Sequence, residues 1–311
     1  MTPVNHKNRA NELLSSLANY ETDNGSFAGL RTASRRATLV KQIISSIRRI
    51  EYISAIQSRQ IAPERTDPHS VLFDPIRGAS ALNRKGEVDE ATWLTFIGTQ
   101  FGKHKDDGWK LAANVMGSFG ADTVWTASRY GHSRQQFFEM LKSQRNALSD
   151  PKRSGRYSNH RQYQSKAPES IARTFQSFYE WQFSEGGIRQ LLHSTHKKHG
   201  QNPATTFDFL YKSLNVVSGF GRLGKFDLLT MLGKLHILPI EAGSTYLSGA
   251  TGPLAGARLL FFNDRDNSTT ARQLQPRVDL LDKYLGVGKQ VIEDSLCNWQ
   301  KSPDVYEYFR G

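Results

Sequence analysis

The chain has 311 residues, 38% of them hydrophobic and 11% aromatic, which is enough to build a packed core and excludes a disordered chain. Its one cysteine, Cys297, excludes an internal disulfide, a four-cysteine iron–sulfur cluster and a cysteine-rich zinc site. The chain lacks the roughly 18–20 uncharged apolar residues of a membrane span, and its first residues lack the apolar core of a signal peptide. We therefore expect a cytoplasmic protein.

The positive charge is concentrated in two stretches. Lys and Arg number 41 against 29 Asp and Glu, a formal net charge of +12. Residues 31–60 and residues 142–166 each hold seven basic residues against one acidic residue, a net of +6 for each stretch. Clustered positive charge attracts polyanions. DNA, RNA or an anionic membrane surface would satisfy this pattern, as would a solvated basic face without a partner.

Apolar residues spaced three and four apart predict helices along most of the chain, and no repeat of fixed length appears. The expected helical segments, in chain order, are 34–57, a helix after Asp89, two helices within 108–142, 169–192, a helix with Thr205 or Thr206 as N-cap, 222–235, and further helices interrupted near 263–276. Residues 1–30 have weak periodicity, whereas 60–90 and 149–168 are expected to be irregular. The best strand signal, Leu259–Phe262, is weak.

The most informative stretch is the turn Gly219-Phe220-Gly221 between two amphipathic segments. Glycines permit the backbone angles of a tight turn and the close approach of another backbone. The helix that follows begins with unpaired N–H groups and a partial positive charge, which together bind phosphate whatever the base sequence. The turn resembles the helix-hairpin-helix motif, which grips a DNA backbone. The expected backbone-contacting residues are Gly219, Phe220, Gly221, Gly224 and Lys225, with Arg35 and Arg36 from the first basic stretch.

Two other interpretations of this turn stay open. Gly219-x-Gly221-x-x-Gly224 also matches the dinucleotide-binding fingerprint. That motif follows a strand, however, and the residues before Gly219 are expected to be helical. The turn could also be a plain corner between two helices with no ligand.

Two carboxylates are candidates for catalysis. In the glycosylases that use this hairpin, an aspartate follows a Pro-Val-type dipeptide downstream of the turn. Here Pro239-Ile240-Glu241 occupies that place, with glutamate in place of aspartate. Asp227, at the edge of an apolar stripe, could have a raised pKa and act as acid or base, or could pair with Arg222. The position of the family's Schiff-base lysine is Leu223 here, which favours hydrolysis without a lyase step, with Lys225 close by.

Polar residues that can hydrogen-bond a base edge or sugar, or stack on a flipped base, gather in further segments. The expected base- and sugar-binding residues are Lys103, His104, Asn159, His160, Arg161, Tyr163 and Arg222, with solvated loops as the alternative. His193, His196 and His199 drift around a helix with no carboxylate nearby, so we expect no metal and no cofactor. The glycine-rich segment 249–260 predicts either a second backbone grip or close helix packing.

Several segments together resemble the alpha-glutamyl/putrescinyl thymine pyrophosphorylase family. They are Phe73-Asp74-Pro75-x-Arg77-Gly78-Ala79, Asp89-Glu90-Ala91-x-Trp93-Leu94, Phe101-Gly102-Lys103-His104 with Gly108-Trp109, Asn159-His160-Arg161-x-Tyr163, Phe220-Gly221-Arg222 with Phe226-Asp227, and Tyr246-Leu247-x-Gly249-Ala250-Thr251-Gly252-Pro253. That family is associated with hypermodified phage DNA and is thought to share ancestry with helix-hairpin-helix glycosylases. Some relatives resemble anti-phage defence enzymes that remove glucosylated hydroxymethylcytosine. The resemblance implies chemistry at a modified base in DNA.

The expected fold is one mainly α, helix-hairpin-helix DNA glycosylase-like domain over 1–311, with room for two lobes. Its parts would be a basic helical N-terminal region (1–68), the family core (69–262) with the hairpin at 207–235, and C-terminal helices (263–311).

The expected function is that of a DNA glycosylase in anti-phage defence. It would flip a bulky modified pyrimidine, such as alpha-glucosyl-hydroxymethylcytosine, out of double-stranded phage DNA and excise it, leaving an abasic site. One alternative is a transferase that substitutes an amine or amino acid for pyrophosphate on 5-hydroxymethyluracil in DNA. The other is a DNA-binding protein without chemistry. The sequence leaves the modified base, the catalytic carboxylate and the oligomeric state open.

Overall fold

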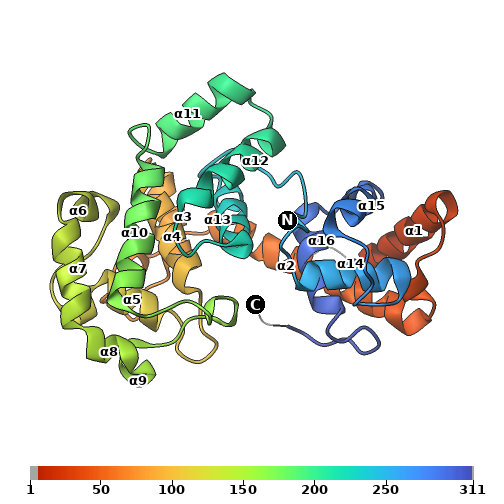
Figure 1. Ribbon diagram of the computed structural model, residues 1–311, viewed down its shortest axis with the longest axis horizontal. Helices are drawn as coiled ribbons and strands as arrows, with labels where there is room; N and C mark the ends of the chain where they lie inside the picture. Colours follow the sequence, from red (N-terminus) through yellow and green to blue (C-terminus); the bar gives the residue numbers. More distant parts are fainter. Residues whose placement is uncertain (1–5, 310–311) are drawn as a thin grey trace. The chain divides into compact units, whose positions relative to one another are not determined.

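The computed structural model describes residues 6–309, with side chains from residue 8 onward, and these residues are mainly helical (Figure 1). Within this range no strand forms; a single isolated bridge pairs His104 with Gly108. The prediction of a mainly α fold is thus confirmed. No helix of the described part is both long enough and apolar enough to cross a membrane.

The chain divides into two compact units. Unit 1 is formed by the described residues up to Tyr52 together with those from Ala242 onward, and unit 2 is Ile53–Glu241. The first and last parts of the chain therefore fold together, and unit 2 is continuous in sequence. The organisation as one glycosylase-like domain with parts 1–68, 69–262 and 263–311 stays a prediction.

Unit 1 is a bundle of helices around an aliphatic and aromatic core. Its helices are α1 (His6–Asn24), most of α2 (Ala33–Gln57), α14 (Gly252–Phe262), α15 (Ala271–Leu285) and α16 (Lys289–Trp299), with the short 3₁₀ helix η1 (Ala28–Leu30). The sequence predicts α2 correctly, because Leu39, Ile43 and Ile47 fall on one buried face. The weakly periodic N-terminal residues form α1, which buries Leu13 and Leu17.

The glycine-rich segment that leads into α14 is explained by close helix packing. A Cβ at Gly252 would lie 2.5 Å from the sulfur of Cys297, and a Cβ at Gly256 would lie 2.3 Å from the carbonyl oxygen of Leu296. The weak strand expectation at Leu259–Phe262 is wrong, because these residues complete α14. A short apolar run is ambiguous by itself, and here the packing against α16 makes it helical.

Unit 2 is built around α4, which is buried along nearly its whole length. Its elements are η2 (Pro63–Thr66), α3 (Pro75–Arg84), α4 (Val88–Phe101), α5 (Lys110–Met116), η3 (Ser118–Gly120), α6 (Ala127–His132), α7 (Arg134–Ser143), α8 (Arg145–Ser149), α9 (Pro151–Ser154), η4 (Asn159–Arg161), α10 (Pro168–Gln182), α11 (Ile188–His199), α12 (Pro203–Ser213), η5 (Leu214–Val216) and α13 (Arg222–Lys234). Phe96 of α4 stacks on Phe178 of α10, with ring centroids 3.9 Å apart. This core fixes the end of α4, from which the candidate site is built.

Two local expectations in unit 2 are corrected. The segment 60–90 is not wholly irregular, because Pro75 starts α3, where its missing N–H costs nothing. The N-cap of α12 is Asn202, whose side chain accepts hydrogen bonds from two backbone N–H groups, rather than Thr205 or Thr206. In both places a proline, Pro75 or Pro203, occupies the first turn of a helix, although proline in a sequence is also typical of irregular connections.

Candidate functional site

A glycine turn joins α12 and α13, which lie side by side (Figure 1). Gly219 has φ +77°, a backbone conformation that favours glycine, and Gly221 precedes the first residue of α13. Phe220 is buried and packs on the ring of Phe96, with centroids 5.8 Å apart, and also on Gly224. Both turn glycines are exposed, and a Cβ at Gly221 would meet no described atom within 4 Å. The turn is thus anchored by its aromatic residue while its backbone faces solvent.

Side chains from distant segments hold this turn in place. Gln164 donates from Nε2 to the carbonyl oxygen of Gly219 at 2.7 Å, and Ser177 accepts from the N–H of Ser218 at 2.9 Å. A Cβ at Gly219 would also lie 3.1 Å from Oγ1 of Thr174. Sequence reasoning missed these supporting residues, because no local pattern links them to the turn.

The centre of the site is an ion pair between Arg161 and Asp227. Arg161 donates from Nη2 to Oδ2 of Asp227 and from Nε to the carbonyl oxygen of Thr99, both at 2.8 Å. The Arg161 side chain is 8% exposed and that of Asp227 is 33% exposed. Among the described residues, Oδ1 of Asp227 has no hydrogen bond. One carboxylate oxygen is therefore held by Arg161, and the other is open to a ligand or water.

The segment that carries Arg161 packs closely against the end of α4. Gly102 follows α4 with φ +65°, and a Cβ there would lie 2.0 Å from Oγ of Ser158. The N–H of Ser158 also donates to the carbonyl oxygen of Phe101 at 3.0 Å. This contact fixes the segment from its buried side, while its exposed side carries three of the expected base- and sugar-binding residues: Asn159, His160 and Tyr163.

A second loop, after α4, is tied to the same segment. Asp107 accepts two hydrogen bonds from Arg156, each 2.8 Å, and these bonds lower the pKa of Asp107 to about 2. In this loop Nδ1 of His104 accepts from the N–H groups of Asp106 and Asp107, at 3.2 Å each, and Lys103 is exposed. The structure thus brings together the two polar segments that the sequence identified separately.

Comparison with protein families shows the family to which the chain belongs. A family model described as alpha-glutamyl/putrescinyl thymine pyrophosphorylase clade 3 matches residues 34–311. The chain belongs to this family. The match includes all of unit 2, and with it the glycine turn and the Arg161–Asp227 pair. No curated protein and no solved structure matches the chain.

In this family member the two candidate carboxylates lie at different ends of the α12–α13 hairpin. Asp227 lies within two turns of the glycine turn. Glu241 is exposed, and its N–H lies 3.5 Å from the carbonyl oxygen of Pro203, at the start of α12. The preceding residue, Ile240, packs on Gly233 near the end of α13. The structure therefore places Asp227, and not Glu241, with the turn and the two polar loops.

Two basic side chains of the hairpin turn toward its own helices. Lys225 is buried, donates to Oδ1 of Asn215 at 2.6 Å and lies 4.2 Å from the ring centroid of Tyr211. Burial lowers the pKa of Lys225. The Arg222 guanidinium lies over the ring of Phe226, 5.0 Å from its centroid, whereas the guanidinium that holds Asp227 is that of Arg161.

Arg35 and Arg36 belong to unit 1 and are engaged there. Arg35 donates to both carboxylate oxygens of Asp304, at 2.7 and 3.2 Å, and to Asn263 at 2.5 Å. Arg36 makes a bidentate pair with Glu21, at 2.7 and 2.8 Å. Within the described residues both guanidinium groups therefore stabilise unit 1 itself.

The described side chains contain no group of three His, Cys, Asp or Glu that could hold a metal ion. Of the three histidines of α11, His199 instead packs its ring on Phe209, with centroids 4.3 Å apart.

Proposed function

We propose that this protein is a DNA glycosylase that excises a bulky modified pyrimidine, such as alpha-glucosyl-hydroxymethylcytosine, from phage DNA. The family description names enzymes of a modified thymine, which supports a modified DNA base as the substrate. The observation that carries the proposal is the position of Asp227. It is held by Arg161 and lies about 9 Å along the axis of α13 from Gly221, at roughly 1.5 Å per residue. A nucleotide whose phosphate binds the turn would bring its sugar toward this carboxylate.

In the proposed reaction, backbone N–H groups at the start of α13 bind a phosphate of the flipped nucleotide. Asp227 stabilises positive charge that develops on the sugar, or activates the attacking water through Oδ1. Water forms a bond to the sugar C1′, and the base leaves with the electrons of the N-glycosidic bond and takes up a proton. Arg161 acts as a positioning residue, since its guanidinium is buried and contacts Asp227 and Thr99.

Specificity would come from the two polar loops. Lys103, His104, Asn159 and His160 carry hydrogen-bonding groups, which suit the hydroxyls of a sugar attached to the base. The Arg156–Asp107 pair holds the loops together, so the pocket would be formed before the base arrives. Leu223 stands where lyase-type enzymes carry a lysine, which favours hydrolysis that leaves an abasic site.

The family description also favours a second function, a transferase that substitutes an amine or amino acid for pyrophosphate on 5-hydroxymethyluracil in DNA. In that reaction the amine nitrogen forms a bond to the base methylene carbon, and the carbon–oxygen bond to pyrophosphate breaks. Asp227 would take the proton that the attacking amine releases. The cationic side chain of Lys103 would face the leaving pyrophosphate.

The deciding experiment incubates the full chain with glucosylated, pyrophosphorylated and unmodified duplexes, and measures free base, abasic sites and new base adducts. Release of the glucosylated base from modified DNA alone supports the glycosylase, whereas an adduct without abasic sites supports the transferase. Asp227→Asn should abolish the reaction, and Glu241→Gln, a matched amide substitution at the other end of the hairpin, should preserve it. DNA binding without any product would indicate a non-enzymatic DNA-binding protein. A fully active Asp227→Asn variant would refute the assigned role of Asp227.

A further inference from the structure

The second basic stretch, residues 142–166, is partly neutralised by the fold. Four of its seven basic side chains form ion pairs with carboxylates: Lys142 with Glu139, Arg145 with Glu169, Arg156 with Asp107 and Arg161 with Asp227. Lys152 and Arg153 are exposed, and their side chains make no hydrogen bond or ion pair within the described part of the chain. The charge that this stretch presents to a partner is therefore concentrated on α9.

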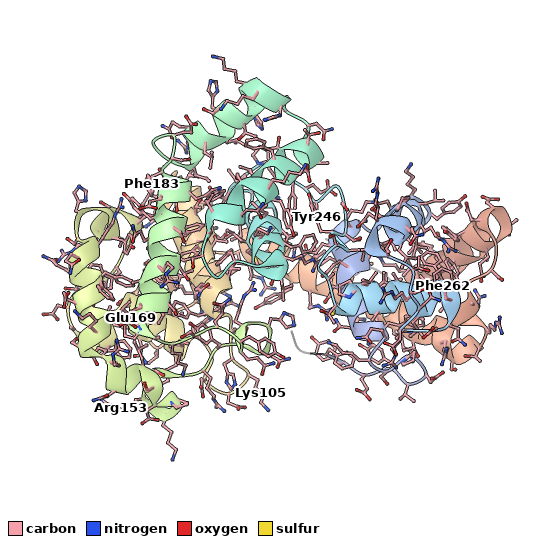
Figure 2. The ribbon with its side chains drawn as sticks, in the orientation of Figure 1. Lys105, Arg153, Glu169, Phe183, Tyr246 and Phe262 are labelled. Carbon is pink, nitrogen blue, oxygen red and sulfur yellow. The ribbon has the colours of Figure 1, made fainter. Side chains whose placement is uncertain are left out.

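Three lysines from another segment join α9 on the surface of unit 2. Lys110 of α5 donates from Nζ to the carbonyl oxygen of Lys152 at 2.7 Å, so the two lysines are neighbours. Lys103 and Lys105 lie on the loop before α5, which Asp107 ties to the segment after α9 through Arg156. We call Lys103, Lys105, Lys110, Lys152 and Arg153 the α5–α9 basic strip; Figure 2 labels Lys105 on the loop and Arg153 on α9.

The acidic residues nearest this strip are already engaged. Asp107 and Asp106 pair with Arg156, and the side chain of Asp150 caps α9 by accepting from the N–H of Lys152. The strip and Arg156 together hold six cations against these three carboxylates, so the charge of the strip region stays positive, at a net of +3. Asn114 also joins α5 to α9, since its amide donates to the carbonyl oxygens of Arg153 and Ser154 at 3.1 and 3.0 Å.

We propose that the α5–α9 basic strip binds the phosphate backbone of duplex DNA next to the candidate site, without regard to base sequence. This inference rests on the proposed function, since it extends the DNA-binding surface of the same site. Gly155 follows α9 with φ +88° and packs on α5, where a Cβ would lie 2.8 Å from the backbone nitrogen of Leu111. The chain then leads directly into the polar segment that carries Arg156 and Arg161. Duplex DNA carries one negative charge per ~1.7 Å of axis, so a row of cations can contact successive phosphates.

The test compares two double variants of equal charge change. Lys152→Gln with Arg153→Gln removes two cations of the strip, and Lys197→Gln with Lys198→Gln removes two exposed cations from the end of α11. Binding to modified and unmodified duplexes is measured as a function of salt. The strip variant should lower the slope of log Kobs against log salt by about 1.8, because each phosphate contact contributes about 0.9. When the salt concentration rises from 50 to 200 mM, the affinity of the strip variant should fall by a factor about ten times smaller than that of the wild type.

The strip variant should weaken binding to both duplexes equally. It should leave the single-turnover rate at saturating protein unchanged, because Lys152 and Arg153 have no part in the proposed reaction and Lys103 is kept. If wild-type binding depends on salt and the strip variant has the same slope as the wild type, the inference is overturned and the proposed function stays intact. Equal slope changes in both double variants would also overturn it, since the effect would then follow net charge rather than place. A wild type that binds RNA in preference to duplex DNA, or binds no duplex, would overturn the inference and the proposed function together.

Discussion

Replacing Arg161 with Gln should destabilise unit 2 and slow the reaction, and adding Asp227→Asn should restore part of the lost stability. Arg161 is 8% exposed and holds both Asp227 and the carbonyl oxygen of Thr99, each at 2.8 Å. Removing one partner of a buried ion pair costs about 3–5 kcal/mol. Because Asp227 is 33% exposed, solvent screens part of this cost, and we expect about 2–3 kcal/mol for the broken pair. The Thr99 carbonyl loses a donor, which adds about 1 kcal/mol.

The Asp227→Asn substitution should be milder, at about 1–2 kcal/mol. The buried Arg161 guanidinium loses its counter-charge, but an amide oxygen still accepts its hydrogen bond. In the double variant no charge is left without its partner. We therefore expect a coupling energy between the two positions of about 2–3 kcal/mol, within the range found for residues in direct contact and larger than the cost of Asp227→Asn alone.

The coupling can be measured by urea denaturation followed through tryptophan fluorescence, since four of the five tryptophans, including the fully buried Trp93, lie in unit 2. Single-turnover rates on modified DNA are measured beside it. Arg161→Gln should lower the rate at saturating DNA with little change in DNA affinity, because a positioning residue acts through Asp227. If the two substitutions are additive within about 0.5 kcal/mol, the ion pair does not stabilise the site and this reasoning fails.

Three further predictions concern the loops. Gly102→Ala should lower the unfolding free energy by about 2–4 kcal/mol, because a Cβ there meets both positive-φ strain and overpacking against Ser158. Gly108→Ala, at φ +59° with no described atom within 4 Å of its Cβ, should lower it by about 1 kcal/mol. Equal losses would contradict the close contact at Gly102. The pKa of Asp107 falls from 3.8 to about 2 on folding, so its stabilisation is present above pH 3.8 and is lost as the pH falls through about 2. The unfolding free energies of the wild type and Asp107→Asn should therefore differ near pH 5 and converge near pH 2. A pH-independent difference would argue against the ion pair. Tyr163 is 91% exposed and precedes Gln164, which bonds the glycine turn. Tyr163→Ala should therefore weaken duplex binding by about 1–3 kcal/mol through lost stacking, while Tyr163→Phe retains it. Unchanged affinity in the alanine variant would leave Tyr163 as part of a solvated loop.

The sequence predicted the helices whose apolar faces repeat over several turns. The helices expected over 34–57 and 222–235 form as α2 and α13, because an apolar stripe at helical spacing depends only on near neighbours in the chain. The sequence also predicted the glycine turn before α13. Gly219 adopts a positive φ, and the preference of glycine for such a conformation does not depend on distant contacts. Short segments were less predictable: Leu259–Phe262 carries a weak strand signal and becomes helical through its packing in unit 1.

The sequence also identified the polar segments of the site, but not how they meet. Arg161 and Asp227 are 66 residues apart in sequence, and Arg156 and Asp107 are 49 apart. From the sequence, Arg161 was expected to contact a base. In the folded protein it is buried and pairs with the carboxylate of Asp227. Ion pairs form between side chains that the fold brings together, so a local sum of charges cannot show which cations remain free for DNA.

The sequence by itself thus determined a mainly helical chain, a glycine turn and two candidate carboxylates. Only the tertiary structure separated those carboxylates, by placing Asp227 against Arg161 and Glu241 beside the start of α12. The physical reason is that helix formation and turn geometry follow from interactions over a few residues, whereas burial, hydrogen-bond partners and surface charge depend on which distant segments pack together.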